Sequence, residues 1–201
     1  MINMAAPIKK TKVVEKWKNK QWYKVFAPKI FDLREIDEII SNDEANLINR
    51  ILSCTLAEIT KQHSQSSIFT SLKFRIVEVK DKNAYTKFIG HEIASSYIKS
   101  LSKRNRSMIN VVHNLKTKDD CILKVKVIAI TENKVSQNTK KNIYNAIVEE
   151  FKKVSTDYVF DQFIQEVIFG KFASKIFNRL KQITPMRRVE VRKSELNETF
   201  A

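Results

Sequence analysis

The sequence predicts an α+β protein with a strand-rich core, either a barrel-like or a strongly twisted sheet, and with helices packed on it. Two patterns support this prediction. Apolar and polar residues alternate with period two in several runs of residues 21–131, whereas apolar residues recur at helical spacing through residues 139–183. With 201 residues, 43% of them hydrophobic, the chain is long enough to form one domain with its own core.

Short runs rich in apolar, aromatic and β-branched residues are expected to be strands. They cover residues 21–27, 51–59, 67–79, 83–90, 108–116, 121–131 and 189–192. A hairpin turn is expected at Lys80-Asp81-Lys82-Asn83, although this stretch lacks the glycine that such turns prefer. Residues 122–129 have one apolar side, and the lysines of the other side, Lys124 and Lys126, would suit phosphate.

Helices are expected where apolar residues are spaced three or four apart and polar capping residues precede them. The expected helices cover residues 44–50, 92–103, 139–153, 157–168 and 171–183. Within 92–103 the apolar face consists of Ile93, Tyr97, Ile98 and Leu101. Pro185 ends the last helix.

Composition excludes several classes of protein. Two glycines, Gly90 and Gly170, cannot build a Gly-rich phosphate loop, and the interior Gly90 is expected to hold a backbone position that a side chain would spoil. Cys54 and Cys121 are expected to be buried or half-buried strand thiols, in a reducing, cytosolic and metal-free protein. We expect no signal peptide, because the start lacks a long apolar centre, and no membrane span.

Charge is the strongest functional signal. The chain has 37 basic against 22 acidic residues, a net charge of +15, which indicates a polyanionic partner. Nucleic acid is the first candidate and an anionic membrane surface the second. A solvated basic face explains any single cluster about as well, but the clusters together favour RNA. The expected contacts are Lys9, Lys10, Lys12, Lys16, Lys18 and Lys20 in a flexible tail, Lys99, Lys103, Arg104 and Arg106, Lys140 and Lys141 (with Lys152 and Lys153), and Arg187, Arg188 and Arg192 (with Lys193).

Two groups of residues allow more than one interpretation. Trp17, Trp22 and Tyr23 lie among lysines and could stack on unpaired bases, but we favour Trp22 as a core anchor of the first strand and leave Trp17 open. His91 and Glu92 could in principle support acid–base chemistry, yet no second histidine completes a zinc-helix motif. We therefore expect no catalytic site at these histidines and no metal.

Several stretches in one colinear order, across about residues 12–195, resemble a known family. They are the lysine- and tryptophan-rich lead into Trp22-Tyr23 and Ala27-Pro28, then Lys87-Phe88-Ile89-Gly90-His91-Glu92, Tyr97-Ile98-Lys99-Ser100-Leu101, Thr117-Lys118-Asp119-Asp120, Phe163-Ile164-Gln165-Glu166-Val167-Ile168-Phe169-Gly170, and Thr184-Pro185-Met186-Arg187-Arg188-Val189-Glu190-Val191. They resemble the archaeal-type small-subunit ribosomal protein family S-one-e, also called S-three-a-e. The chain departs from that pattern at Asp120, where the family usually has glycine, and over residues 32–50.

The resemblance implies a structural, cytoplasmic component of the small-subunit platform, near the messenger exit side and the 3′ end of the small-subunit RNA. It implies ribosomal RNA and neighbouring platform proteins as partners, with messenger RNA near the exit, no cofactor and no catalysis. We expect no membrane partner and no homo-oligomer. The expected organisation is a basic flexible tail (1–20), a single rRNA-binding domain (21–195) and a short C-terminal tail (196–201).

Two other functions remain open from the residues alone. A free-standing RNA-binding assembly or translation factor would share the charge pattern, but would leave mature subunits. An RNA-processing enzyme would depend on His91 and Glu92.

Overall fold

The computed structural model describes residue 17, residues 20–62 and residues 64–198. The expected contacts Lys9, Lys10, Lys12, Lys16 and Lys18 therefore lie outside the described residues, as does residue 63. Within the described part, strands and helices alternate along the chain, with most of the helical residues in the last third.

Eight strands form one sheet. They are β1 (Gln21–Phe26), β2 (Glu35–Ser41), β3 (Ile51–Thr55), β4 (Thr70–Lys80), β5 (Asn83–Ile93), β6 (Met108–Lys116), β7 (Ile122–Thr131) and β8 (Met186–Asn197). The α-helices are α1 (Leu56–Thr60), α2 (Gln65–Phe69), α3 (Ser95–Leu101), α4 (Gln137–Asp157), α5 (Phe160–Ile168) and α6 (Lys171–Lys181). Single 3-10 turns occur at Lys29–Phe31 and Glu44–Asn46.

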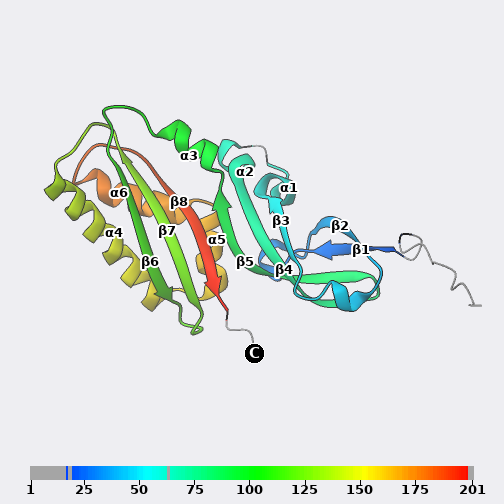
Figure 1. Ribbon diagram of the computed structural model, residues 1–201. Coiled ribbons are helices and arrows are strands. Elements are labelled where there is room, and N and C mark those ends of the chain that lie inside the picture. Colours follow the sequence, from blue (N-terminus) through cyan, green and yellow to red (C-terminus); the bar gives the residue numbers. More distant parts are fainter. Residues whose placement is uncertain (1–16, 18–19, 63, 199–201) are drawn as a thin grey trace, which may run out of the picture.

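The sheet has two halves that meet at β5. Its strand order is β2-β1-β5-β8-β7-β6, and β4 pairs with β5 beside this path and carries β3. The start of β5 pairs with β1 in parallel, and its end pairs with β8 antiparallel at Gly90, His91 and Glu92. In Figure 1 the half with β6, β7 and β8 lies to the left and the half with β1 to β4 to the right. The sheet is open, so the expectation of a twisted sheet holds and the barrel-like alternative is wrong.

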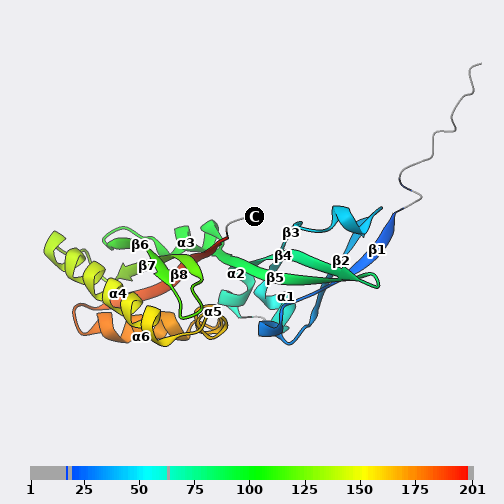
Figure 2. The ribbon, with the colours of Figure 1, turned by 90° about the horizontal axis from the view of Figure 1, so that it is seen from below.

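The long helices cover one face of the β6-β7-β8 half, and α3 lies over the other (Figure 2). Apolar residues of α4, α5 and α6 pack onto the inward residues of β6 and β7, among them Phe151, Phe163, Phe172, Val111 and Val125, which are buried. A second cluster under β1 and β2 contains Tyr23, Val25, Ile39, Leu47, Ile76 and Ala84. The period-two and helical patterns of the sequence thus mark the two surfaces that pack together.

The hairpin between β4 and β5 forms without glycine. Asp81 and Lys82 both have left-handed backbones, with φ of 48° and 65°, as the tight two-residue turn requires. The carbonyl oxygen of Lys82 accepts a hydrogen bond of 3.0 Å from the backbone N–H of Lys24. The strained turn is therefore held by β1 as well as by its own hairpin.

Several predicted bounds need correction. The run 51–59 is strand β3 followed by helix α1, and the start of 67–79 is helix α2, because Thr55 with Glu58 and Ser64 with Ser67 form capping boxes there. Residues 35–41 are a strand that the sequence analysis did not identify. The predicted helix 44–50 is a single 3-10 turn, and Ile93 belongs to β5 rather than to α3. The strand predicted at 189–192 is longer at both ends and runs from Met186 to Asn197.

Cys54 lies in β3 and Cys121 directly before β7; both are half-buried free thiols. Burial raises the pKa of the Cys54 thiol to about 12, so this sulfur is an unreactive packing group. No helix in the described part of the chain is long and apolar enough to cross a membrane.

Candidate nucleic-acid interface

Helix α3 stands on the sheet face opposite α4, α5 and α6. Its buried Tyr97 and Ile98 pack against Ile128 and Ile130 of β7, as the amphipathic pattern predicted. The ring of Tyr97 also stacks on Phe69, with ring centroids 5.1 Å apart. This contact fixes the helix, so the side chains on its other face are presented from a rigid support.

A groove of about 720 Å³ runs between α3, the loop after it and the start of β8. Phe69, Tyr97 and Leu101 form its apolar part, and Ser96 and Ser100 contribute hydroxyls. Its lining also includes four basic residues, Lys103, Arg106, Arg187 and Arg188. We call this the α3 groove. Two basic clusters that are more than eighty residues apart in the sequence meet in it.

The basic residues of the α3 groove differ in their partners. The Nε of Arg188 donates to Glu190 over 2.7 Å, and this contact raises the pKa of the guanidinium. Lys103, Arg106 and Arg187 make no ion pair with any described carboxylate. Uncompensated like charges at one groove repel each other, and a bound polyanion would relieve that repulsion.

Other predicted contacts lie outside the α3 groove. Lys99 and Arg104 are exposed but do not line it. Arg192 is farther along β8, where it lies near Glu92 and Lys193. Lys140 and Lys141 lie in the first turns of α4, and the 1.5 Å helical rise puts Lys152 about 18 Å from Lys140 along the axis. The α4 lysines are therefore two separate groups.

The aromatic residues near the N-terminus differ in their burial, and not in the way that we expected. Tyr23 is buried, whereas Trp22 is 60% exposed, so the interpretation of Trp22 as a core anchor is wrong. Neighbouring residues on a strand point to opposite faces, and Tyr23 occupies the inward one. Trp17 is exposed as well, and the ammonium of Lys20 lies 4.1 Å from the centre of its ring.

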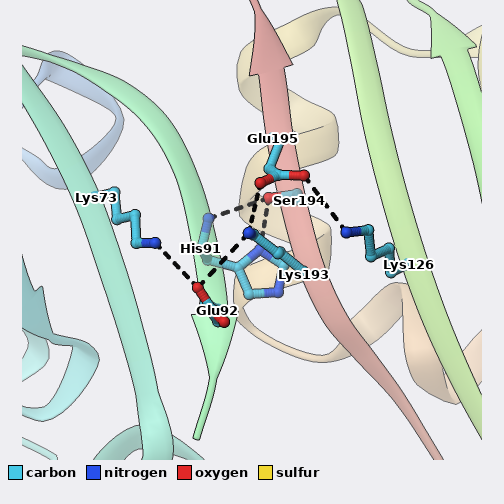
Figure 3. A network of polar contacts seen from close by, with 7 residues as sticks. All are labelled: Lys73, His91, Glu92, Lys126, Lys193, Ser194 and Glu195. Carbon is cyan, nitrogen blue, oxygen red and sulfur yellow. Dashed lines mark hydrogen bonds and ion pairs between the residues drawn. The ribbon is translucent and has the colours of Figure 1, made fainter.

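The lysine side chains of β7, which the sequence placed on one side of the strand, lie next to carboxylates of the neighbouring strand. A chain of ion pairs crosses β4, β5, β8 and β7 (Figure 3). It joins, in order, Lys73, Glu92, Lys193, Glu195 and Lys126. Its shortest links are Lys193 to Glu195 at 2.5 Å and Lys73 to Glu92 at 2.9 Å. These contacts lower the pKa of both glutamates. This face therefore carries less uncompensated positive charge than the α3 groove.

His91 and Glu92 do not form a catalytic pair. Adjacent strand residues point to opposite faces, and His91 is buried while Glu92 joins the chain of ion pairs on the outside. The Nε2 of His91 lies 2.9 Å from the carbonyl oxygen of Val191, and Nδ1 lies 2.6 Å from the Ser194 hydroxyl. Both ring nitrogens are thus engaged. Nowhere in residues 20–62 and 64–198 do three potential metal-binding side chains gather.

Two pairs of adjacent acidic residues, Asp119-Asp120 and Glu149-Glu150, also have structural partners rather than forming a carboxylate site. Glu149 and Glu150 both bind Arg179 of α6, and Asp119 accepts a hydrogen bond from the backbone N–H of Phe160 at the start of α5.

Three residues of the α3 groove, Phe69, Ser96 and Ser100, were not predicted from the sequence. The spacing of Ser96 and Ser100, four apart on the polar face of α3, was the available signal.

The fold and the groove define a class of protein. It is a basic α+β protein with a groove lined by four cations, three of which have no ion pair with a described carboxylate, and with a buried histidine whose two ring nitrogens both have hydrogen-bonding partners. The model of the ribosomal S3Ae family matches residues 8–199. The protein named small ribosomal subunit protein eS1 of Methanoculleus marisnigri is 35% identical over 188 residues, 94% of each chain. The eS1 protein of Saccharolobus islandicus is 35% identical over 184 residues, 92% of this chain and 88% of the other.

The eS1 protein of Staphylothermus marinus is 37% identical over 188 residues, 94% of this chain and 88% of the other. The chain therefore belongs to the ribosomal S3Ae family, a family of structural ribosomal proteins rather than enzymes. The resemblance expected from its motifs is confirmed.

Proposed function

We propose that this protein is a structural constituent of the small ribosomal subunit in the cytoplasm, and that the α3 groove binds ribosomal RNA. The family and its curated relatives support the ribosomal role. The observation that carries the groove assignment is the convergence of Lys103, Arg106 and Arg187 with no carboxylate partner among the described residues. Arginine donates two parallel hydrogen bonds to phosphate, and the two groove serines suit sugar and phosphate oxygens.

The proposal extends to position and to further contacts. Resemblance to the family supports a place on the platform near the messenger exit side and the 3′ end of the small-subunit RNA. Neighbouring platform proteins, and messenger RNA at the exit, are then the further partners. Other basic residues would contact the RNA outside the groove. They are the flanking Lys99 and Arg104, the separate Lys20, Lys140, Lys141 and Arg192, and the N-terminal lysines.

Salt dependence of RNA binding tests the groove. Each phosphate neutralised contributes about −0.7 to −0.9 to the slope of log K against log salt. The variant Lys103→Gln/Arg106→Gln/Arg187→Gln is expected to lower the magnitude of that slope by about 2 to 3 on an rRNA fragment. The matched control Lys29→Gln/Lys118→Gln/Lys134→Gln removes three exposed lysines elsewhere, none of them in a predicted RNA-binding cluster, and should change the slope by less than 1. Equal slopes for the two variants would contradict the assignment.

Stoichiometry separates a subunit component from a free-standing factor. The native protein should sediment with small subunits at one copy each and remain after a high-salt wash. Release from mature subunits in that wash would favour an assembly or translation factor.

A further inference from the structure

A second cavity lies on the other side of Arg187 and Arg188. It is open to solvent, has a volume of about 440 Å³ and is bordered by the turn after α5, by α6 and by the start of β8. Its lining contains two aromatic rings, Phe169 and Phe177. We call it the aromatic cavity. Because Arg187 and Arg188 line both, the aromatic cavity and the α3 groove adjoin along one rim.

Phe169 is presented to solvent by a fixed piece of backbone. Its N–H donates to the carbonyl oxygen of Gln165 over 3.0 Å, which ends α5, and Gly170 follows with a left-handed φ of 73° and begins α6. The side chain of Phe169 is 54% exposed, although burying a phenyl ring is ordinarily favourable by roughly 1.5–3 kcal/mol. Phe177, by contrast, packs one side against the core. Phe169 therefore offers an exposed ring, on a well-fixed turn, to a ligand in the aromatic cavity.

The rest of the lining has the composition of a site for a planar, partly polar ligand. Ala173 and Val189 are small or branched apolar groups, while Asn178 and Ser174 offer hydrogen bonds. Glu190, which holds Arg188, supplies a carboxylate that can accept from an amino group. Arg187 has no described carboxylate partner and stands at the rim shared with the α3 groove.

We propose that the aromatic cavity receives the base of one unpaired ribonucleotide, which stacks on Phe169 and Phe177 while Arg187 holds its phosphate. The inference rests on the proposed function, since the α3 groove would supply the RNA strand on either side. Charge favours RNA over a protein segment as the occupant, because the rim is shared with a groove lined by cations. Stacking on aromatic rings tolerates any base, and the polar groups would then select among bases.

Three RNA hairpins of matched stem sequence test the proposal with the full chain. One has a single bulged adenosine, the second an abasic residue at the bulge, and the third no bulge. The first two carry equal charge, so any difference in affinity reports the base alone. The bulged adenosine is expected to bind about tenfold more tightly than the abasic hairpin, the size expected for one base on an aromatic ring. A 2-aminopurine at the bulge should lose fluorescence on binding.

The variant Phe169→Leu/Phe177→Leu keeps apolar side chains but removes both rings. It is expected to bind adenosine-bulged and abasic hairpins equally, with unchanged affinity for the unbulged hairpin and an unchanged circular dichroism spectrum. Tyr144→Leu on α4 removes an aromatic ring that is 43% exposed elsewhere, and should keep the tenfold preference. Should the double variant unfold, Arg187→Gln gives a second test, because it should reduce affinity for all three hairpins and most for the bulged one.

The outcomes separate the two proposals. Equal binding of bulged and abasic hairpins by the native protein, with a steep salt dependence, would overturn the aromatic cavity as a nucleotide site and leave the α3 groove standing; a neighbouring protein would then be its occupant. A preference that survives loss of both rings would also overturn it. Failure to bind any of the hairpins would count against both proposals.

Discussion

A Cβ atom placed on Gly90 would lie 2.1 Å from the backbone carbonyl oxygen of Ser194. Real Cβ atoms do not approach backbone oxygens so closely, so only glycine fits at this point of β5. The contact lies where β5 pairs with β8, and only three residue pairs join these strands: Gly90 with Glu195, His91 with Ser194, and Glu92 with Lys193. The two halves of the sheet can therefore join here only because Gly90 has no side chain.

Gly90→Val is expected to lower the free energy of unfolding by about 3 kcal/mol or more, because the new side chain must push β8 away from β5. Urea denaturation of the variant beside the parent measures this. Gly170→Ala is a useful comparison, because nothing lies within 4 Å of an added Cβ there and only the left-handed φ is strained. A Gly90→Val protein that unfolds like its parent would refute the close approach.

Ser194→Ala should cost about 2 kcal/mol of stability. The carbonyl oxygen of Val191 can only accept, so the Nε2 of His91 carries the proton and Nδ1 must accept from the Ser194 hydroxyl. Alanine leaves Nδ1 buried without a donor. Chemical denaturation should show this loss, while Ser95→Ala, at an exposed serine that starts α3, should stay within about 0.5 kcal/mol of the parent.

Acid is expected to destabilise the protein through His91. Burial, the largest cause, lowers the pKa of His91 from 6.5 to about 4. Between pH 6.5 and pH 4, His91 is protonated in the unfolded chain but stays neutral in the folded protein. The contribution of neutral His91 to the free energy of unfolding is therefore complete above pH 6.5 and decreases as the pH falls below that value. The loss from pH 8 to pH 5 should be about 2 kcal/mol. Denaturation at several pH values measures the slope, and His91→Gln should flatten it; a steep slope retained in that variant would assign the effect elsewhere.

Two charge-reversed variants separate the α3 groove from its surroundings. Lys103→Glu/Arg106→Glu reverses residues that line the groove, and Lys99→Glu/Arg104→Glu reverses exposed neighbours that do not. Both change the net charge equally. The first should weaken incorporation into small subunits at least tenfold. The second should weaken it only about threefold, because Lys99 and Arg104 would contact the RNA outside the groove, and both variants should melt close to the parent. Equal effects would mean that only total charge matters.

The neighbours Trp22 and Tyr23 are expected to behave oppositely. Tyr23→Ala removes a side chain that is only 4% exposed from the cluster under β1 and β2, and should cost about 3 kcal/mol or more. Trp22→Ala removes one that is 60% exposed and should cost less than about 1 kcal/mol. Urea denaturation of both variants checks this, and a large loss for Trp22→Ala would restore its role in the core.

Local patterns predicted the elements whose partners lie close in sequence. The β4–β5 and β6–β7 hairpins follow from alternation and a turn, and Asp120 shows how a departure from the family pattern is absorbed: its φ of 57° keeps the left-handed turn that glycine would favour. Helices α1 and α2 were missed because each has only five residues, too few to show a helical period, and because Ile59, Thr60, Ile68 and Phe69 also suit strands. The capping boxes at Thr55 and Ser64 were the available signal.

Distant pairings could not be read from the sequence. Nothing local indicates that Gly90 faces Ser194, or that residues 103 and 106 share a groove with residues 187 and 188. The basic clusters could therefore be identified by composition, but only the structure shows that Arg187 and Arg188 line the α3 groove and that Arg192 does not. Trp22 was misassigned because a strand's inward side depends on its partners, here β2 and β5.

The last strand of the chain is inserted between β5 and β7 rather than added at an edge. During synthesis, β5 and the β6–β7 hairpin leave the ribosome long before residues 186–197 do. Until then the facing edges of β5 and β7 carry backbone groups without a partner strand, and such edges readily pair with other chains. The two halves can each collapse early, but they can join only after residues 186–197 have emerged, so the nascent protein passes through a period in which aggregation competes with completion of the sheet.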